Sequence, residues 1–202
     1  MPRPYTDREK ETIKENIIRN GLKLIHEKGY THTSITDITR AAGVSKAFFY
    51  TMFPSKEAVV TEGLKRQERI AVKKAQEIAV IATLTQREKL VTFMKWLVSS
   101  INHTIFFLTP GEAGHVSQML TDQEREVFFQ NLVNQQSKIL RAFSIDLDTV
   151  NVYVFGNLVI NLFMVCGSKE NMDCYHQESF DEALLCLIRG IADYACPSSV
   201  NE

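Results

Sequence analysis

The sequence predicts an all-α fold of about nine helices. Local helix starts recur, in which a Ser or Thr precedes a Glu by three residues: Thr6, Thr85, Thr121 and Ser179. Such a hydroxyl accepts a backbone N–H from the first turn, and the Glu side chain bonds back to the cap residue. Apolar residues follow these starts at helical spacing, and no strand hairpin or internal repeat stands out. The chain of 202 residues is long enough for one or two domains with a real core.

The stretch 41–57, AAGVSKAFFYTMFPSKE, predicts two short helices joined by a tight turn. Gly43 can take the positive φ that such a turn needs. Ser45 can cap the next helix, and Pro54-Ser55 separates that helix from the following one, which we expect over about 56–82. Two short helices joined through a glycine indicate a helix-turn-helix.

Residues 8–57 resemble the DNA-binding end of bacterial TetR-family transcriptional regulators. The matching pieces, in order and at family spacing, are Gly29-Tyr30, Thr33-Ser34-Ile35, Asp37-Ile38, Ala42-Gly43-Val44-Ser45-Lys46, Phe49-Tyr50 and Phe53 to Glu57. Thr39, Phe48 and Met52 depart from the residues usual in the family. The resemblance implies an N-terminal three-helix DNA-binding domain (1–54) and a C-terminal helical domain for effector binding and dimerisation (55–202).

A recognition helix presents its N-terminal residues to base edges in the major groove. Here these residues are Ser45, Lys46, Ala47 and Phe48. Lys46 can donate to guanine or to a phosphate, and Phe48 can contact a thymine methyl. From the residues alone Phe48 could instead pack inward beside Phe49. The resemblance implies that Phe49 is core and that Phe48 faces DNA.

The resemblance also implies that Tyr50, Thr51 and Lys56 contact the DNA backbone. Thr33 and Ser34 open a helix whose free N–H groups favour a phosphate, although both could be plain N-caps. Residues 1–56 carry ten Lys/Arg against six Asp/Glu, an excess of positive charge that fits binding to a polyanion such as DNA. The excess is too small to indicate DNA binding by itself.

Other classes of protein find little support in the sequence. It contains no nucleophile-elbow, zincin, P-loop or dinucleotide motif, so we expect no catalytic, metal or cofactor site. The N-terminus shows no signal peptide, which favours the cytoplasm and reduced thiols. Residues 149–168 carry no charge, but Asn151, Asn157 and Asn161 argue against a membrane span and predict a buried helix.

The C-terminal domain is rich in large apolar residues with a few interleaved polar ones. The resemblance implies an effector cavity there, and its candidate lining residues are Phe93, Trp96, His103, Phe107, Phe128, Asn157 and Asn161. Each could equally be an ordinary core residue. The scarcity of charge predicts a small, mostly apolar effector.

The last two helices carry apolar residues on more than one face, which predicts a homodimer through them. The leading hypothesis is a ligand-responsive repressor that binds palindromic double-stranded DNA. The alternatives are a regulator of the same fold that answers to a protein partner and, remotely, a helical enzyme.

Overall fold

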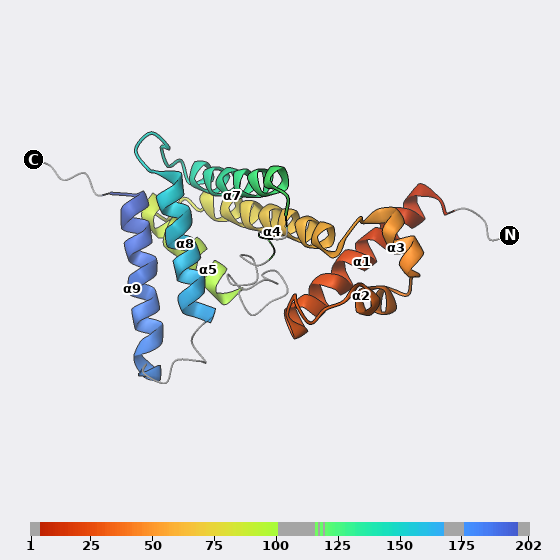
Figure 1. Cartoon of the computed structure of the whole chain (residues 1–202). Coiled ribbons are helices and arrows are strands. Elements are labelled where there is room, and N and C mark those ends of the chain that lie inside the picture. Colours follow the sequence, from red (N-terminus) through yellow and green to blue (C-terminus); the bar gives the residue numbers. More distant parts are fainter. Residues whose placement is uncertain (1–4, 101–115, 117, 119, 168–175, 198–202) are drawn as a thin grey trace, which may run out of the picture. The chain divides into compact units, whose positions relative to one another are not determined.

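The computed structural model describes residues 5–100, 116, 118, 120–167 and 176–197, and these contain eight helices and no strand (Figure 1). The helices are α1 (Asp7–Lys28), α2 (Ile35–Ala42), α3 (Lys46–Met52), α4 (Lys56–Ala79), α5 (Gln86–Ser99), α7 (Asp122–Ala142), α8 (Val152–Gly167) and α9 (Gln177–Ala195). The all-α prediction is therefore confirmed, with eight described helices in place of about nine. The short segment expected before residue 120 falls mostly outside the described residues. Of this segment, Val116 and Gln118 are described, and both are helical.

The described residues pack into two compact units, and the division falls inside α4, between Gln67 and Glu68. The sequence-based boundary lies earlier, between residues 54 and 55. The difference has a physical reason: Val59 and Val60 in the first turns of α4 are fully buried in the core of unit 1. Arg66, further along α4, pairs with Glu15 of α1.

Unit 1 is assembled from helices whose starts are fixed locally. The Thr6 hydroxyl accepts the Glu9 N–H of α1 at 3.3 Å, and the Glu9 carboxylate accepts the Thr6 N–H at 2.8 Å. Ser34 and Asp37 form the same reciprocal pair at the start of α2. These caps satisfy backbone donors that have no partner within the helix. They confirm the predicted start of α1.

The core of unit 1 joins α1, α2, α3 and the first part of α4. Its fully buried members include Ile17, Ile18, Ile25, Ile38, Phe49, Val59 and Val60. Gly21 allows the close approach of α1 to α4, since a Cβ at this position would lie 3.1 Å from Val59 Cγ1. The core therefore fixes the face of α3 that carries Phe49.

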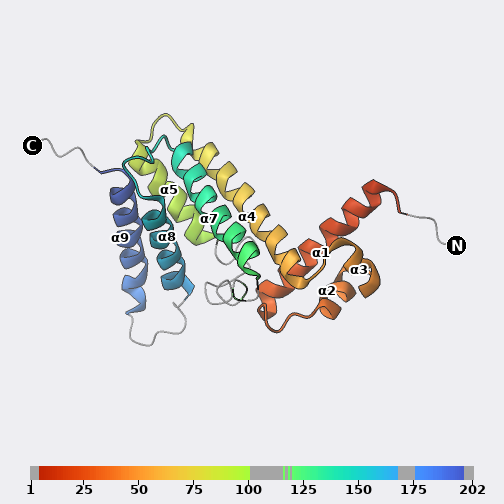
Figure 2. The ribbon, with the colours of Figure 1, turned by 45° about the horizontal axis from the view of Figure 1, so that its top comes forward.

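Unit 2 contains α5, α7, α8, α9 and the part of α4 from Glu68 onward. Helix α8 packs against both α7 and α9 (Figure 2). Its buried side chains include Leu90, Phe93, Met94, Leu140, Phe143, Phe155, Leu162, Ile188 and Ile191. Two ion pairs cross the surface of this unit: Arg87 of α5 with Asp193 of α9, and Lys138 of α7 with Glu68 of α4.

The predicted start of the last helix is wrong. The last helix begins at Gln177 with His176 as its cap, not after Ser179; the Ser179 hydroxyl instead lies 3.2 Å from His176 Nδ1. Within the single chain, α7 and α9 cover part of helix α8, and Asn157 and Asn161 are exposed. None of the described helices combines the length and apolarity needed to cross a bilayer.

Candidate nucleic-acid interface

The turn between α2 and α3 has the backbone geometry that the sequence predicts. Gly43 ends α2 in the left-handed region, with φ 69° and ψ 30°. Ser45 then caps α3, and its hydroxyl accepts the Phe48 N–H at 3.1 Å. An L-residue with a side chain is strained at this φ, so glycine here determines the direction in which α3 leaves the turn.

The first turn of α3 presents Lys46 and Ala47 to solvent, whereas Phe49 is fully buried. The Phe49 ring packs against Phe53, with ring centroids 5.7 Å apart. Phe48 is half-buried and lies outside this core. The structure thus confirms that the two adjacent phenylalanines point to different sides, with Phe49 as the anchor.

The second turn of α3 adds two exposed residues, Tyr50 and Thr51. The Tyr50 side chain is 54% exposed and meets the buried Phe49 ring edge-on at 5.5 Å. The Thr51 hydroxyl donates to the Phe48 carbonyl at 2.6 Å, which leaves its lone pairs available to an outside donor. Both side chains can therefore reach a ligand without disturbing the core.

Of the two residues that open α2, only Ser34 has an exposed side chain. Thr33 is 1% exposed, and its hydroxyl donates to the Gly29 carbonyl at 2.9 Å, where it satisfies the end of α1. The expectation that the Thr33 side chain contacts a phosphate therefore does not fit its burial. Ser34 is exposed while it caps α2, and its bonds with Asp37 lower the pKa of that carboxyl.

Lys56 is bound to the protein itself. Its ammonium group donates to the carbonyl oxygens of Tyr30 at 2.7 Å and Thr33 at 2.9 Å, and it lies 3.8 Å from the centroid of the Tyr30 ring. Partial burial lowers the pKa of Lys56, against the opposing effect of the Glu57 charge. Two of its three N–H groups are used, so at most one is left for a phosphate.

Glu57 completes this cluster by accepting the Tyr30 hydroxyl. Desolvation alone raises the pKa of Glu57, but hydrogen bonds from Tyr30, from its own backbone N–H and from Ser55, together with the Lys56 charge, outweigh it and the net shift is downward. Burial and the same hydrogen bond raise the pKa of Tyr30. Lys56, Glu57 and Tyr30 therefore fasten the start of α4 to the loop between α1 and α2.

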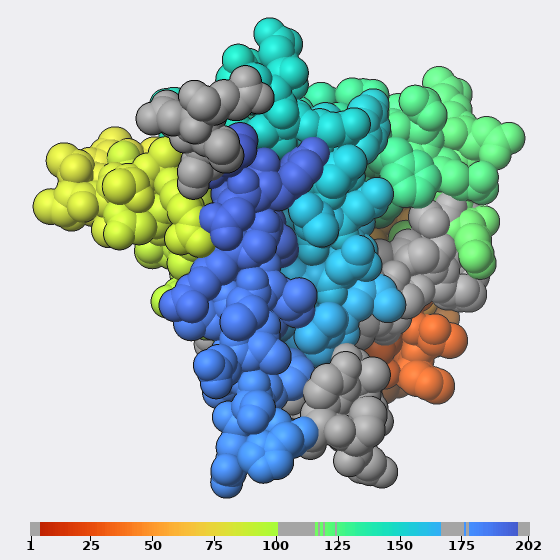
Figure 3. Space-filling model, turned by 90° about the vertical axis from the view of Figure 1, so that its left-hand side faces the viewer, coloured from red at the N-terminus to blue at the C-terminus, as the bar shows by residue number. Residues whose placement is uncertain are grey.

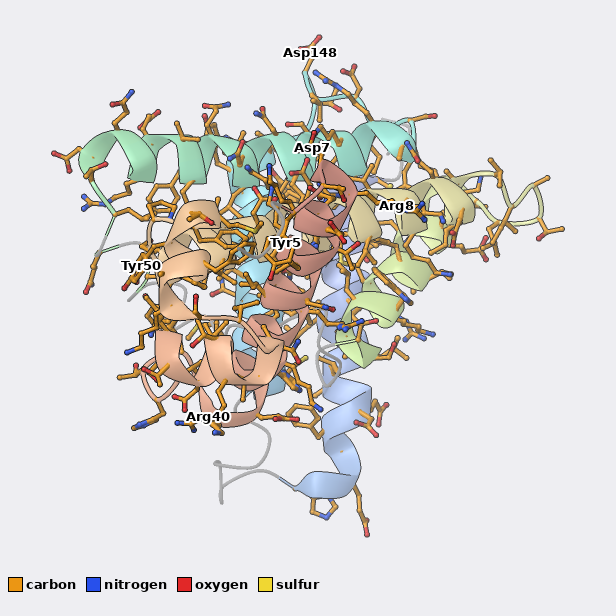
Figure 4. The ribbon with its side chains drawn as sticks, turned by 90° about the vertical axis from the view of Figure 1, so that its right-hand side faces the viewer. Tyr5, Asp7, Arg8, Arg40, Tyr50 and Asp148 are labelled. Atoms are coloured by element: carbon orange, nitrogen blue, oxygen red, sulfur yellow. The ribbon has the colours of Figure 1, made fainter. Side chains whose placement is uncertain are left out.

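Figure 4 labels Tyr5, Arg8, Arg40 and Tyr50 on unit 1. The sequence reasoning did not single out Tyr5 or Arg40. The Tyr5 ring meets the Phe48 ring at 5.0 Å, and Arg40 is exposed in the last turn of α2, just before Gly43. An aromatic residue directly before a capping box is a signal that could have identified Tyr5, because this position often packs against a neighbouring apolar group.

The described candidate effector residues lie in different environments. Phe93 is fully buried and packs against the rings of Trp96 at 5.7 Å and Phe143 at 5.6 Å. Phe128 is half-buried, with its ring beside Phe129. Asn157 and Asn161 are exposed on α8. His103 and Phe107 lie outside the described residues.

Comparison with known proteins assigns the N-terminal part. The family profile described as bacterial regulatory proteins, tetR family, matches residues 17–62. The regulator YuxN of Bacillus subtilis is 45% identical over 53 residues, which are 26% of this chain and 17% of that protein. The biofilm operon icaADBC negative transcriptional regulator IcaR of Staphylococcus aureus is 36% identical over 53 residues, 26% of this chain and 28% of IcaR. The matched stretch is thus less than a third of either relative.

The whole fold also has a counterpart among solved structures. A TetR-family regulator from Mesorhizobium loti superposes with a TM-score of 0.61 at 15% identity, covering 93% of this chain and 97% of the other. The capped α2–turn–α3 arrangement has the geometry of a helix-turn-helix. Residues 17–62 thus match the DNA-binding region of TetR-family regulators, and the fold of the whole chain is similar to that of a TetR-family structure.

Proposed function

We propose that the protein is a transcriptional repressor that binds a palindromic operator in double-stranded DNA as a homodimer. The observation that carries the proposal is the division of α3 into a buried and an exposed side. Phe49 fixes the helix to the core, while Lys46, Ala47, Tyr50 and Thr51 are exposed on one short helix that follows the glycine turn. A helix held in this way can enter the major groove without a change in the unit.

The exposed residues support different kinds of DNA contact. Lys46 stands at the first position of α3 and can bind guanine or a phosphate. Tyr50, Thr51 and Ser34 offer hydroxyl groups to the backbone, which position a protein on DNA without reading sequence. Arg40 adds an exposed charge close to the turn, paired with Asp37 only at 3.7 Å. Repression is proposed by similarity to IcaR, whose name describes a negative regulator.

The homodimer is supported by an exposed stripe on α8, whose outer surface is visible beside α9 in Figure 3. The large apolar residues of this stripe are Tyr153 (64% exposed), Val154 (41%), Ile160 (45%) and Met164 (54%), with Asn157 and Asn161 among them. Leu187 on α9 is 45% exposed. Phe155 and Val159, on the other side of α8, are buried within the chain. An uncharged stripe of this kind fits a two-fold interface between copies of α8 and α9.

From the family resemblance we also propose that a small, mostly apolar effector binds the protein and releases it from DNA. Among the described candidates, Trp96 and Phe128 are the half-buried aromatic residues that could border such a ligand, whereas Phe93 serves the core. The alternative is control by a protein partner without a small ligand. A thermal-shift screen of apolar metabolites, followed by a DNA-release assay for each hit, separates the two.

The test of the DNA-binding proposal is selection from a library of random-sequence duplexes with the full-length protein. We expect an enriched inverted repeat whose two halves are about one helical turn, or a multiple of it, apart. Enrichment of a single unrepeated half-site contradicts the dimer, and the absence of any enriched sequence contradicts the proposed function.

A further inference from the structure

Tyr5 and Phe48 form an aromatic pair at the exposed head of α3. Their ring centroids are 5.0 Å apart and the rings are inclined by 67°, an edge-to-face arrangement. Tyr5 is 52% exposed and Phe48 is half-buried, so the pair lies at the surface of unit 1 and outside its core. Edge-to-face pairs are favourable because the positive edge of one ring meets the negative face of the other.

The position of Tyr5 is fixed by the start of α1. Thr6 caps that helix reciprocally with Glu9, so Tyr5 is the residue directly before the cap. A residue at this place usually packs against the fourth residue of its own helix. Here that residue is Lys10, whose ammonium group pairs with Asp7. Tyr5 takes its aromatic contact from α3 instead.

Tyr5 also lines a depression at the surface of unit 1. The depression has a volume of ≈ 440 Å³ and is lined by Tyr5, Thr6, Arg8, Glu9, Thr12 and Ile13. Phe48 follows the two exposed residues Lys46 and Ala47, in the turn of α3 that meets base edges in the proposed complex. Its partner ring comes from the residue directly before the cap of α1, far from α3 in the sequence, and that ring restricts the orientation of Phe48.

We propose that Tyr5 is a positioning residue for sequence recognition, which holds the Phe48 ring in the orientation that contacts a base. The inference rests on the proposed function. An apolar contact with a base such as the thymine methyl depends on where the ring lies. Loss of one aromatic pair lowers the preference at the affected base pairs by about two- to tenfold.

The experiment uses full-length protein and the duplex enriched from the random-sequence library, together with all its single-base-pair variants. Relative affinities are measured for the wild type, Tyr5→Phe, Tyr5→Ala, Phe48→Ala and the double variant Tyr5→Ala/Phe48→Ala. Tyr5→Phe keeps the ring and is the matched control. Amide hydrogen exchange of α1 and α3 establishes for each variant that unit 1 is folded.

We expect Tyr5→Phe to keep the wild-type preferences. Tyr5→Ala should flatten the preference at the same base pairs as Phe48→Ala, and should add little in the Phe48→Ala background because the two residues act as one unit. An unchanged preference in Tyr5→Ala, or an equal loss of affinity for every duplex, overturns the inference. Full additivity in the double variant also overturns it, since Tyr5 then acts independently of Phe48. A wild-type protein that enriches no sequence overturns the proposed function itself, and this inference with it.

Discussion

Replacing Lys56 by alanine separates a structural role from a DNA-binding role at one residue. The ammonium group donates to two backbone carbonyls, at 2.7 and 2.9 Å, and the substitution removes both bonds. A hydrogen bond to a charged group contributes about 1.5–3 kcal/mol when it is shielded from water. Lys56 is only partly buried, so water can replace the lost donor, and we expect a total loss of about 1–2 kcal/mol in the stability of unit 1.

The assay is hydrogen exchange of backbone amides in the core of unit 1, residues 17–25 and 56–60. The lost stability should speed exchange by about five- to thirtyfold in these segments. Lys46→Ala is the matched control, because Lys46 is exposed and its loss removes the same charge. Fluorescence of Trp96, the only tryptophan, reports on unit 2 and should be unchanged.

Equal exchange in Lys56→Ala and Lys46→Ala would refute the structural role of Lys56. The salt dependence of DNA affinity then gives a second reading. If the remaining N–H of Lys56 also binds a phosphate, the slope of log affinity against log salt falls by about one. If Lys56 only fastens α4, the slope stays at its wild-type value.

Three further changes have defined outcomes. Gly43→Ala places a Cβ at φ 69°, which costs about 1–2 kcal/mol, and should lower the thermal midpoint of unit 1 although open space surrounds the site. Ile160→Asp on the exposed stripe of α8 should yield monomers in sedimentation experiments at micromolar concentration, whereas Glu178→Gln on α9 should leave the dimer intact; dimers of Ile160→Asp contradict this interface. The pKa of Glu57 is lowered on folding, so its ionised form contributes stability above the ordinary carboxyl pKa and loses it as pH falls through the folded value. Wild type should therefore exceed Glu57→Gln in stability at neutral pH, and the gap should close in acid; a gap independent of pH excludes the charge as its origin.

Local sequence signals predicted where several helices begin. The capping hydroxyls of Thr6, Ser34, Ser45 and Thr85 all accept the N–H three residues on, because a cap depends on a few neighbouring residues in the chain. Ser179 shows the limit of this reasoning. Its spacing to Glu182 suggests a cap, yet α9 already begins at Gln177.

The orientation of side chains was harder to predict because it depends on contacts distant in sequence. Asn157 and Asn161 lie on an uncharged helix that suggests burial, but α7 and α9 cover only part of α8. Thr33 lies in a segment typical of a phosphate site, but its hydroxyl donates to the Gly29 carbonyl at the end of α1. Nothing in the local sequence around Lys56 shows that two carbonyls from residues 30 and 33 surround its ammonium group.

The central claim is that the head of α3 reads DNA, and the most direct measurement compares Lys46→Ala with Lys95→Ala. Both residues are exposed and both changes remove one positive charge, but Lys95 lies on α5 in unit 2. Affinities are measured by fluorescence anisotropy on the library-selected duplex and on a scrambled one. We predict that Lys46→Ala loses about 1–3 kcal/mol of binding to the selected duplex while Lys95→Ala binds like wild type. Equal affinities for the two variants would contradict the account.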